Sequence, residues 1–164
     1  YNKAVAFMTS EITIQTILQK HLAGGEAFMP LTHLLSEINF EKVGERAYNL
    51  PYSFYELFYH ITFAQKDILK YCISETYSSS NWPDDYWPKE QAPKSETDWQ
   101  NLQKDYLNDR KQLEQIIENK PLTSFVPAGK DHTLLREILL VIEHTAYHTG
   151  QLAIVLRLLG IHKK

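Results

Sequence analysis

The spacing of apolar residues restricts the fold of this chain more than any other feature. Four long segments repeat apolar residues every three or four positions, which is the period of an α-helix, and none alternates apolar and polar residues as a half-buried strand does. We expect long helices at residues 10–22, 53–73, 96–118 and 133–159, and a shorter helical piece at residues 30–38. Four amphipathic helices with one long connection predict an all-α protein whose single domain, residues 1–164, is a four-helix bundle.

Residues that begin and end helices support these boundaries. Ser53 and Glu56 form the Ser-x-x-Glu pattern of a capping box, and Pro51 blocks an earlier start of that helix. The remaining signals are Pro30, Ser95 and Thr133 at helix starts and Gly24, Gly25 and Gly160 at helix ends. The second long helix therefore has the best-defined start.

Each long helix carries an apolar face that should turn toward the core. This face consists of Ile14, Ile17, Leu18 and Leu22 on the first helix and of Leu57, Ile61, Ala64 and Ile68 on the second. His60 lies at the edge of the second face, one turn from both Leu57 and Ala64. We expect its side chain to point at the core or beside it.

Residues 74–94 form a long connection that is rich in proline and aromatic residues. It holds three of the seven prolines and two of the three tryptophans. Disordered segments contain few aromatic residues, so we expect Trp82, Tyr86 and Trp87 to pack against the helices. They either cover a functional site or only plug the end of the bundle, and the sequence leaves both interpretations open.

Net charge and the length of apolar runs exclude several classes of function. The formal net charge of −3 provides no basic field for binding nucleic-acid phosphates. Charged residues or histidines break each apolar stretch well before about 18 residues, and the chain does not open with a signal-peptide pattern. We expect a cytoplasmic protein without nucleic-acid or membrane partners. Its single cysteine, Cys72, lies among apolar neighbours and is expected to be an inert core thiol.

The stretch EHTAYHTGQL, residues 143–152, places His144 and His148 four residues apart on the last predicted helix. This spacing separates two side chains by about 40° around the helix and about 6 Å along it, so both imidazoles can reach one metal ion. Two histidines alone rarely hold an ion tightly, and ordinary surface or core histidines also show this spacing. The pair by itself therefore leaves the metal hypothesis open.

A third ligand would strengthen that hypothesis, and His60 is the best candidate because bundles assemble metal sites from facing helices. The alternative is a core histidine that is hydrogen-bonded to a neighbour. The remaining histidines are expected at the surface: His21, His33, His132 and His162. Three neutral imidazoles would leave a divalent ion with an open coordination position, which is typical of catalytic sites. Protonation of such ligands predicts metal loss as the pH falls through about 6.

Three further polar residues lie within reach of the histidines. Gln151, three residues after His148, can orient a ligand or a bound water, or it can be solvated. Asp67, seven residues after His60, is either a carboxylate that supports the site or acts as acid or base, or a structural charge. Tyr147 is a candidate proton donor or substrate contact. No phosphate-binding glycine loop, Gly-x-Ser-x-Gly elbow or Cys-x-x-Cys pair competes with this site.

Two segments resemble one known family. HTLLREILLVIEHTAYHTGQLAIVLRLLG, residues 132–160, resembles the last helix of the DinB/YfiT-like superfamily, with His-x3-His-x-Gly-Gln ahead of an Arg-x-Leu-Gly ending. LPYSFYELFYHITFAQKDIL, residues 50–69, resembles the second helix of that family, in which a serine-initiated helix carries a lone histidine. The WPDDYWP loop is similar to a branch of the same superfamily, and the resemblance extends from about residue 22 to residue 160.

The resemblance implies a four-helix bundle that binds a divalent metal, most often nickel or zinc, through His60, His144 and His148. It also implies a homodimer formed through bundle helices. Characterised members include transferases and isomerases that depend on the low-molecular-weight thiols bacillithiol or mycothiol, while many others carry only the general label of metal-dependent hydrolase.

Three functional hypotheses follow from the residues and the resemblance together. The first is a metalloenzyme that acts on a small-molecule substrate, either as a hydrolase or as a thiol-dependent S-transferase. The second is a non-enzymatic stress-response module that binds metal or another ligand. The third is a purely structural helical dimer in which hydrogen bonds satisfy the histidines.

Overall fold

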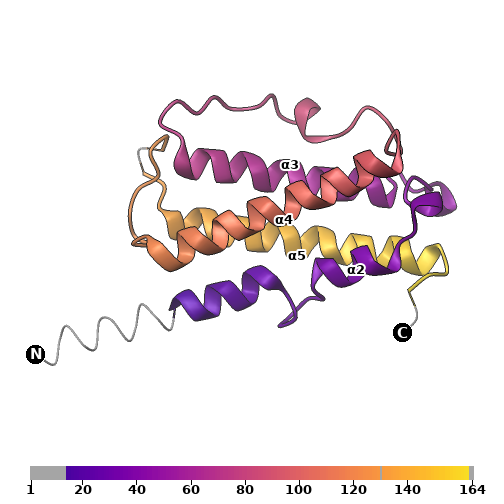
Figure 1. The fold of residues 1–164 in the computed structure, drawn as a ribbon, viewed down its shortest axis with the longest axis horizontal. Coiled ribbons are helices and arrows are strands. Elements are labelled where there is room, and N and C mark those ends of the chain that lie inside the picture. The colour runs from indigo at the N-terminus through magenta and orange to yellow at the C-terminus, as the bar shows by residue number, and fades with distance from the viewer. Residues whose placement is uncertain (1–13, 130, 163–164) are drawn as a thin grey trace, which may run out of the picture.

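The computed structural model describes residues 14–129 and 131–162, and this part of the chain is helical without a named strand (Figure 1). It begins in a helix at residues 14–23. The helices that follow are α2 (Leu31–Glu37), α3 (Phe54–Ile73), α4 (Glu96–Asn119) and α5 (Leu134–Leu158), with short 3₁₀ helices η1 (Phe40–Lys42), η2 (Ala47–Asn49) and η3 (Asp84–Tyr86). The all-α prediction is confirmed, while the expected helix start at Ser10 lies outside the described residues.

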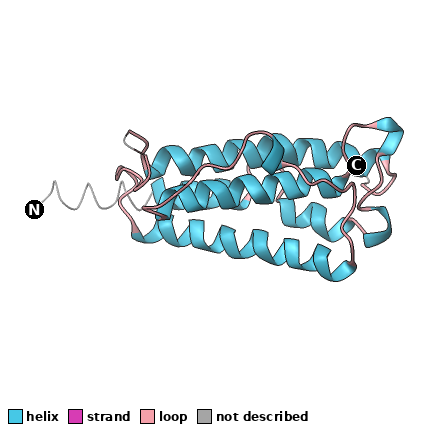
Figure 2. Cartoon of the chain, turned by 90° about the horizontal axis from the view of Figure 1, so that it is seen from above, coloured by secondary structure: helices cyan, strands magenta, loops and turns pink. Residues whose placement is uncertain are grey.

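Three long helices, α3, α4 and α5, pack side by side along the bundle (Figures 1 and 2). The helix at residues 14–23 and α2 lie end to end and complete it on the fourth side. Gly24 and Gly25 separate these two pieces with φ angles of +82° and +100°, which residues with a Cβ rarely adopt. The fourth helix of the bundle is thus built from two segments.

The crossover after α3 decides the order of helix directions. It runs back along the length of α3, so α3 and α4 point the same way and α5 points the opposite way (Figure 1). Long crossovers of this kind occur in bundles that are not simple up-and-down arrangements. The polypeptide between residues 74 and 95 therefore covers the side of α3 instead of extending into solvent.

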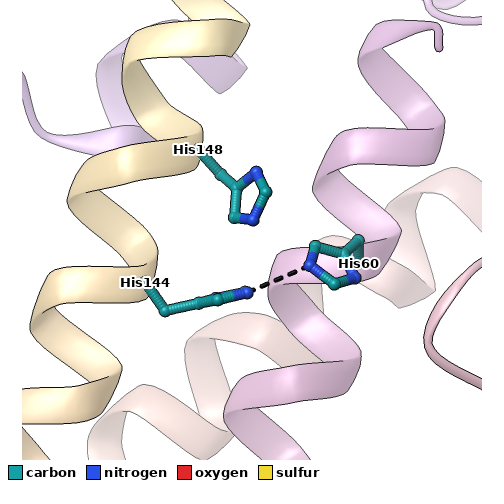
Figure 3. Close-up of side chains that lie close together, drawn as sticks. All are labelled: His60, His144 and His148. Atoms are coloured by element: carbon teal, nitrogen blue, oxygen red, sulfur yellow. Dashed lines mark hydrogen bonds between the residues drawn. The ribbon is translucent and has the colours of Figure 1, made fainter. Parts of the chain in front are cut away.

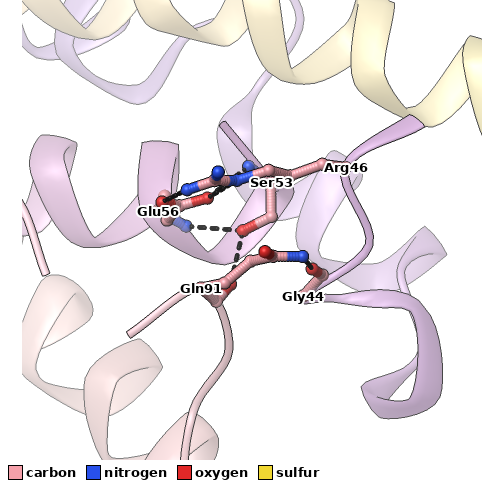
Figure 4. Close-up of polar contacts among 5 residues, drawn as sticks. All are labelled: Gly44, Arg46, Ser53, Glu56 and Gln91. Carbon is pink, nitrogen blue, oxygen red and sulfur yellow. Dashed lines mark hydrogen bonds and ion pairs between the residues drawn. The ribbon is translucent and has the colours of Figure 1, made fainter. Parts of the chain in front are cut away.

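The start of α3 is held by a network of five residues (Figure 4). The Ser53 side chain accepts a hydrogen bond from the Glu56 backbone N–H at 3.2 Å, and the Glu56 carboxylate accepts one from the Ser53 N–H at 2.7 Å. Arg46 donates to both oxygens of the Glu56 carboxylate, including the Oε2 that accepts from Ser53. The predicted capping box is confirmed, as are the serine and threonine caps of α4 and α5.

The same network attaches the end of the crossover to the start of α3. Ser53 Oγ donates to the Gln91 carbonyl at 2.7 Å, and Gln91 Nε2 donates to the Gly44 carbonyl at 2.7 Å. A Cβ at Gly44 would lie 2.3 Å from the Ala92 Cβ, so only glycine permits this close approach. The crossover is therefore fixed at the end where it joins α4.

The apolar core consists of two clusters of buried side chains. One surrounds the first half of α3 and the last part of α5, and the other surrounds the end of α3 and the first part of α5. On α5 they are separated by residues 143–151, which include both histidines. In the same region Arg110 donates to the Tyr106 hydroxyl at 2.7 Å, to Thr145 Oγ1 at 3.2 Å and to the Leu22 carbonyl at 2.6 Å.

Part of the predicted inward face of the first helix is wrong. Leu18 and Leu22 are buried, but Ile14 is 43% exposed and Ile17 is 48% exposed. This helix contacts the bundle along one narrow stripe, and Gln15 already hydrogen-bonds the Glu118 carbonyl in the last turn of α4. Ile14 and Ile17 therefore lie beside the face of this helix, formed by Leu18 and Leu22, that packs into the core.

Within the described ranges, no helix has both the length and the apolar character needed to cross a membrane. The expected cytoplasmic location and the expected homodimer stay predictions.

We predict that Ser53→Ala lowers the free energy of unfolding by about 1–2 kcal/mol, because it removes the cap and leaves two backbone groups without a partner. Ser95→Ala, at the exposed cap of α4, is the matched control and should cost less. Urea unfolding of the two variants measures the difference. Equal losses would show that the contact of Ser53 with Gln91 does not stabilise the fold.

Candidate metal centre

Three histidine side chains from two helices converge between α3 and α5 (Figure 3). One possible ligand atom from each of His60, His144 and His148 lies within 4.8 Å of the other two. Nε2 of His144 is 3.0 Å from Nε2 of His60. In a tetrahedral site with metal–nitrogen bonds of about 2.0–2.1 Å, neighbouring ligand nitrogens are roughly 3.3 Å apart. Small rotations of these side chains are therefore enough for all three nitrogens to bind one ion.

Hydrogen bonds on the outer sides of two rings decide which nitrogen faces the centre. Nδ1 of His60 lies 3.1 Å from the Tyr86 carbonyl oxygen, and Nδ1 of His148 lies 2.5 Å from Oε1 of Gln151. Because these oxygens only accept, each Nδ1 carries the proton and donates it. Nε2 of both rings is left with its lone pair, as a metal ligand requires. The 3.0 Å contact with His60 is then a hydrogen bond donated by Nε2 of His144, and this ring must carry its proton on Nδ1 instead before its Nε2 can bind a metal.

Burial keeps the three imidazoles neutral. It lowers the pKa of His60 to about 4, an effect that the bond to the Tyr86 carbonyl partly opposes. Burial, together with the neighbouring His148 and His60, lowers the pKa of His144 to about 3. Burial also lowers the pKa of His148, against the opposing effect of Gln151. Protons should therefore compete with a metal at a lower pH than the value of about 6 expected from ordinary histidines.

The crossover covers the histidine cluster with aromatic rings. The ring of Trp87 stacks on His60 at a centroid distance of 4.1 Å and an angle of 5°. Trp82 lies 6.2 Å from the same ring and is 66% exposed, so it forms the rim of this cover. The expectation that these aromatic residues pack against the helices is confirmed for Tyr86 and Trp87, while Trp82 is mostly exposed. The three rings lie over a cluster of polar groups instead of plugging the end of the bundle.

Asp67 anchors the crossover to α3. Its carboxylate accepts hydrogen bonds from the Tyr77 hydroxyl at 3.0 Å, from Ser80 Oγ at 3.3 Å and from the Tyr86 hydroxyl. Burial, followed by the bond to Asp67, raises the pKa of Tyr77 to about 12 and also raises the pKa of Tyr86. Of the roles considered for Asp67, the geometry supports the structural one.

The remaining candidate residues occupy different positions around the cluster. Gln151 contacts His148 through its Oε1, so it is placed to orient this ring. The ring of Tyr147 packs edge-on against His148 at 4.9 Å and is 68% exposed, so it borders the cluster from the solvent side. Cys72 is 1% exposed, which confirms its expected place in the core, and burial raises the pKa of its thiol to about 12.

One expected surface histidine is buried. The side chain of His162 is only 6% exposed, and its Nδ1 lies 2.7 Å from Oε2 of Glu37. The chain reverses at Gly160, whose φ is +72°, and brings His162 back against α2. That packing could not be deduced from the position of His162 near the end of the chain.

A pocket of about 430 Å³ lies beside the cluster and has His144 in its wall. Its other walls come from α3, from the crossover and from the first half of α5. At the end away from His144 lie Tyr71, His132, Arg136 and Glu137. The arrangement therefore joins a group of neutral imidazole nitrogens to a space that can admit a small molecule.

Some of these features carried little or no signal in the sequence. The Tyr86 carbonyl is a backbone group, so residue identity says nothing about its role. His132 was expected at the surface because it precedes a helix cap, but its Nδ1 contacts the Tyr71 hydroxyl at 3.0 Å and Arg136 Nη1 at 3.2 Å. The spacing of His132 and Arg136, four residues apart at a helix start, is the one pattern that could have suggested the contact.

The family model of the DinB superfamily matches residues 26–152. This range contains His60, His144 and His148 and the whole crossover between α3 and α4. Neither a curated protein nor a solved structure shows significant similarity to the chain.

We predict that acidification from pH 7 to pH 5 destabilises the chelator-treated protein. Histidines in the unfolded chain take up protons near pH 6.5, while the lowered pKa values keep those of the folded site neutral. The free energy of unfolding therefore decreases as the pH is lowered from 7 to 5. Urea unfolding at several pH values should show a shallower fall for His144→Asn than for the parent. Identical slopes for the two proteins would contradict the burial of a neutral His144.

Proposed function

Because the chain belongs to the DinB superfamily, we propose that it is a metalloprotein whose divalent ion is held by Nε2 of His60, His144 and His148. The observation that carries this proposal is the convergence of three neutral imidazoles, two of which have their Nδ1 protons already donated to fixed oxygens. Zinc and nickel are the metals we expect, since both accept imidazole nitrogen.

The donor set fits a catalytic site better than a storage or structural site. Among the described residues, no aspartate, glutamate or cysteine joins the three histidines in the cluster. A divalent ion held by three neutral ligands would keep its full charge and an open coordination position. As a Lewis acid it would lower the pKa of a water or thiol bound at that position. The pocket that borders His144 is where such a ligand or a substrate can approach.

We propose that the protein is an enzyme that acts on a small molecule, either as a hydrolase or as a thiol-dependent S-transferase. In either reaction Gln151 and the Tyr86 carbonyl orient the histidine rings. Trp87 excludes water from the face of His60 that it stacks on. Tyr147, exposed beside His148, is the side chain best placed to contact a substrate from solvent. The alternative is a module that binds metal or a ligand without turnover.

We predict that the purified, zinc-loaded protein retains about one ion per chain after desalting and that His60→Ala, His144→Ala and His148→Ala lose it. Gln151→Ala should bind the same metal about 10- to 100-fold more weakly, because it removes the acceptor that orients His148. Elemental analysis and a competing chelator measure these effects.

His33→Ala is the matched control for metal content, because His33 is a half-exposed histidine that pairs with Glu37 on α2. It should retain metal like the parent. Retention of the ion by all three variants of the cluster would refute the proposed site.

A reaction screen separates the two enzyme classes from a binding module. We predict that the zinc- or nickel-loaded protein turns over either ester and amide substrates without a thiol, or electrophiles only in the presence of a thiol, and that His148→Ala abolishes the activity. Activity that persists without any thiol would exclude the transferase. Tight metal binding without turnover in either arm would favour the non-enzymatic module.

A further inference from the structure

We propose that the pocket beside His144 binds an elongated organic acid, with its carboxylate at Arg136, its apolar body along Leu140 and a metal-binding head group at the histidines. The head-group contact rests on the proposed metal site, while the contact with Arg136 does not. The molecule is thus a substrate or co-substrate with polar groups at both ends.

The pocket is long because three residues of α5 line it in sequence along the helix. Arg136, Leu140 and His144 are spaced four residues apart and lie on neighbouring turns of one face. Eight residues of helix extend about 12 Å at 1.5 Å per residue. The Arg136 side chain and a bound ion both reach into this span, so an occupant that touches both ends needs a chain of about six carbons, which is longer than a water, a bicarbonate or a small amino acid.

The middle of the pocket is apolar on three sides. Leu140 forms the side contributed by α5 and is 38% exposed. Ala64 and Ile68 face it from α3, and the rings of Tyr77 and Trp82 approach from the crossover. Such a lining favours methylene groups or an aromatic ring over a charged or strongly hydrated segment.

The end of the pocket away from His144 offers one half-exposed cation. The Arg136 side chain is 51% exposed, and its Nη1 donates to Glu137 Oε1 and to Nδ1 of His132. Within residues 14–129 and 131–162, no partner is seen for its Nε and Nη2. Contact with Glu137 holds the guanidinium in place and leaves its other N–H groups to bind a carboxylate.

The two carboxylates of the pocket already have partners. The Glu137 side chain is only 3% exposed and is paired with Arg136. Asp67 accepts hydrogen bonds from Tyr77, Ser80 and Tyr86. Neither is placed to bind a cationic ligand, so the available charge in the pocket is that of Arg136.

Three probes of equal length test the charge preference: 6-mercaptohexanoate, 6-mercaptohexanol and 6-aminohexanethiol. Each has a thiol that can bind zinc, and only the group at the other end differs. Binding to the zinc-loaded protein is measured by calorimetry and by quenching of tryptophan fluorescence, to which Trp82 in the pocket wall contributes. We expect the acid to bind roughly tenfold more tightly than the alcohol, as a charge-assisted hydrogen bond permits.

Arg136→Gln should abolish the preference for the acid and leave the affinity for the alcohol unchanged. Arg157→Gln is the matched control, because Arg157 is an exposed arginine near the end of the same helix and does not line the pocket. Equal binding of acid and alcohol by the parent, tighter binding of the amine, or an unchanged preference in Arg136→Gln would overturn the proposal.

Leu140→Trp provides a second variant in case Arg136→Gln unfolds when Glu137 loses its partner. The larger side chain fills the middle of the pocket, so all three probes should lose affinity while zinc content stays at the parent level. Unchanged affinities in this variant would show that the probes bind elsewhere.

Hexanoate and hexanol, tested on the chelator-treated protein, separate this proposal from the metal site. A preference for hexanoate that depends on Arg136 supports the pocket assignment. If zinc then adds nothing to the affinity of the thiols, the metal proposal alone fails. If zinc strengthens thiol binding but the acid shows no advantage with or without metal, the pocket assignment alone fails.

Discussion

The hydrogen bond from Nδ1 of His60 to the Tyr86 carbonyl joins α3 to the crossover, and the arrangement of the site depends on it. It ties the crossover to the side of α3, directs Nε2 of His60 toward α5, and brings Trp87 against the imidazole ring. The crossover is held at two further places, at Asp67 through tyrosine hydroxyls and at Ser53 through the Gln91 carbonyl. The long proline-rich connection is thereby held against α3 and forms one wall of the candidate site.

Burial determines the protonation state of the histidine cluster. Three imidazoles that lie close together and are partly desolvated cannot all be positively charged. Desolvation and mutual repulsion therefore favour the neutral form, which is the form that can bind a metal. The two apolar clusters on either side leave only a short polar section of α5 between them, and both histidines lie in it. The core therefore limits the polar site to one level of the bundle, where Arg110 also links α4 to Thr145 on α5.

Much of the fold could be predicted from residue patterns because its signals are local. The capping box at Ser53, the caps at Ser95 and Thr133 and the apolar period of each helix are all read within one or two turns. The grouping of His60 with His144 and His148 needed more than local patterns, since facing helices are distant in sequence. The residues made His60 the best candidate for a third ligand, and the family resemblance strengthened this choice. The positions of Ile14, Ile17, His132 and His162 were not predictable, because each depends on which face of a helix meets its neighbours or on where a neighbouring segment packs.

Anomalous diffraction at the metal absorption edge, from crystals of the zinc-loaded protein, tests the central claim most directly. We expect a single strong peak between α3 and α5, about 2.0–2.1 Å from Nε2 of His60, His144 and His148, with the fourth position open to solvent or ligand. A map without a peak at these nitrogens, or with the ion bound at other residues, would contradict it.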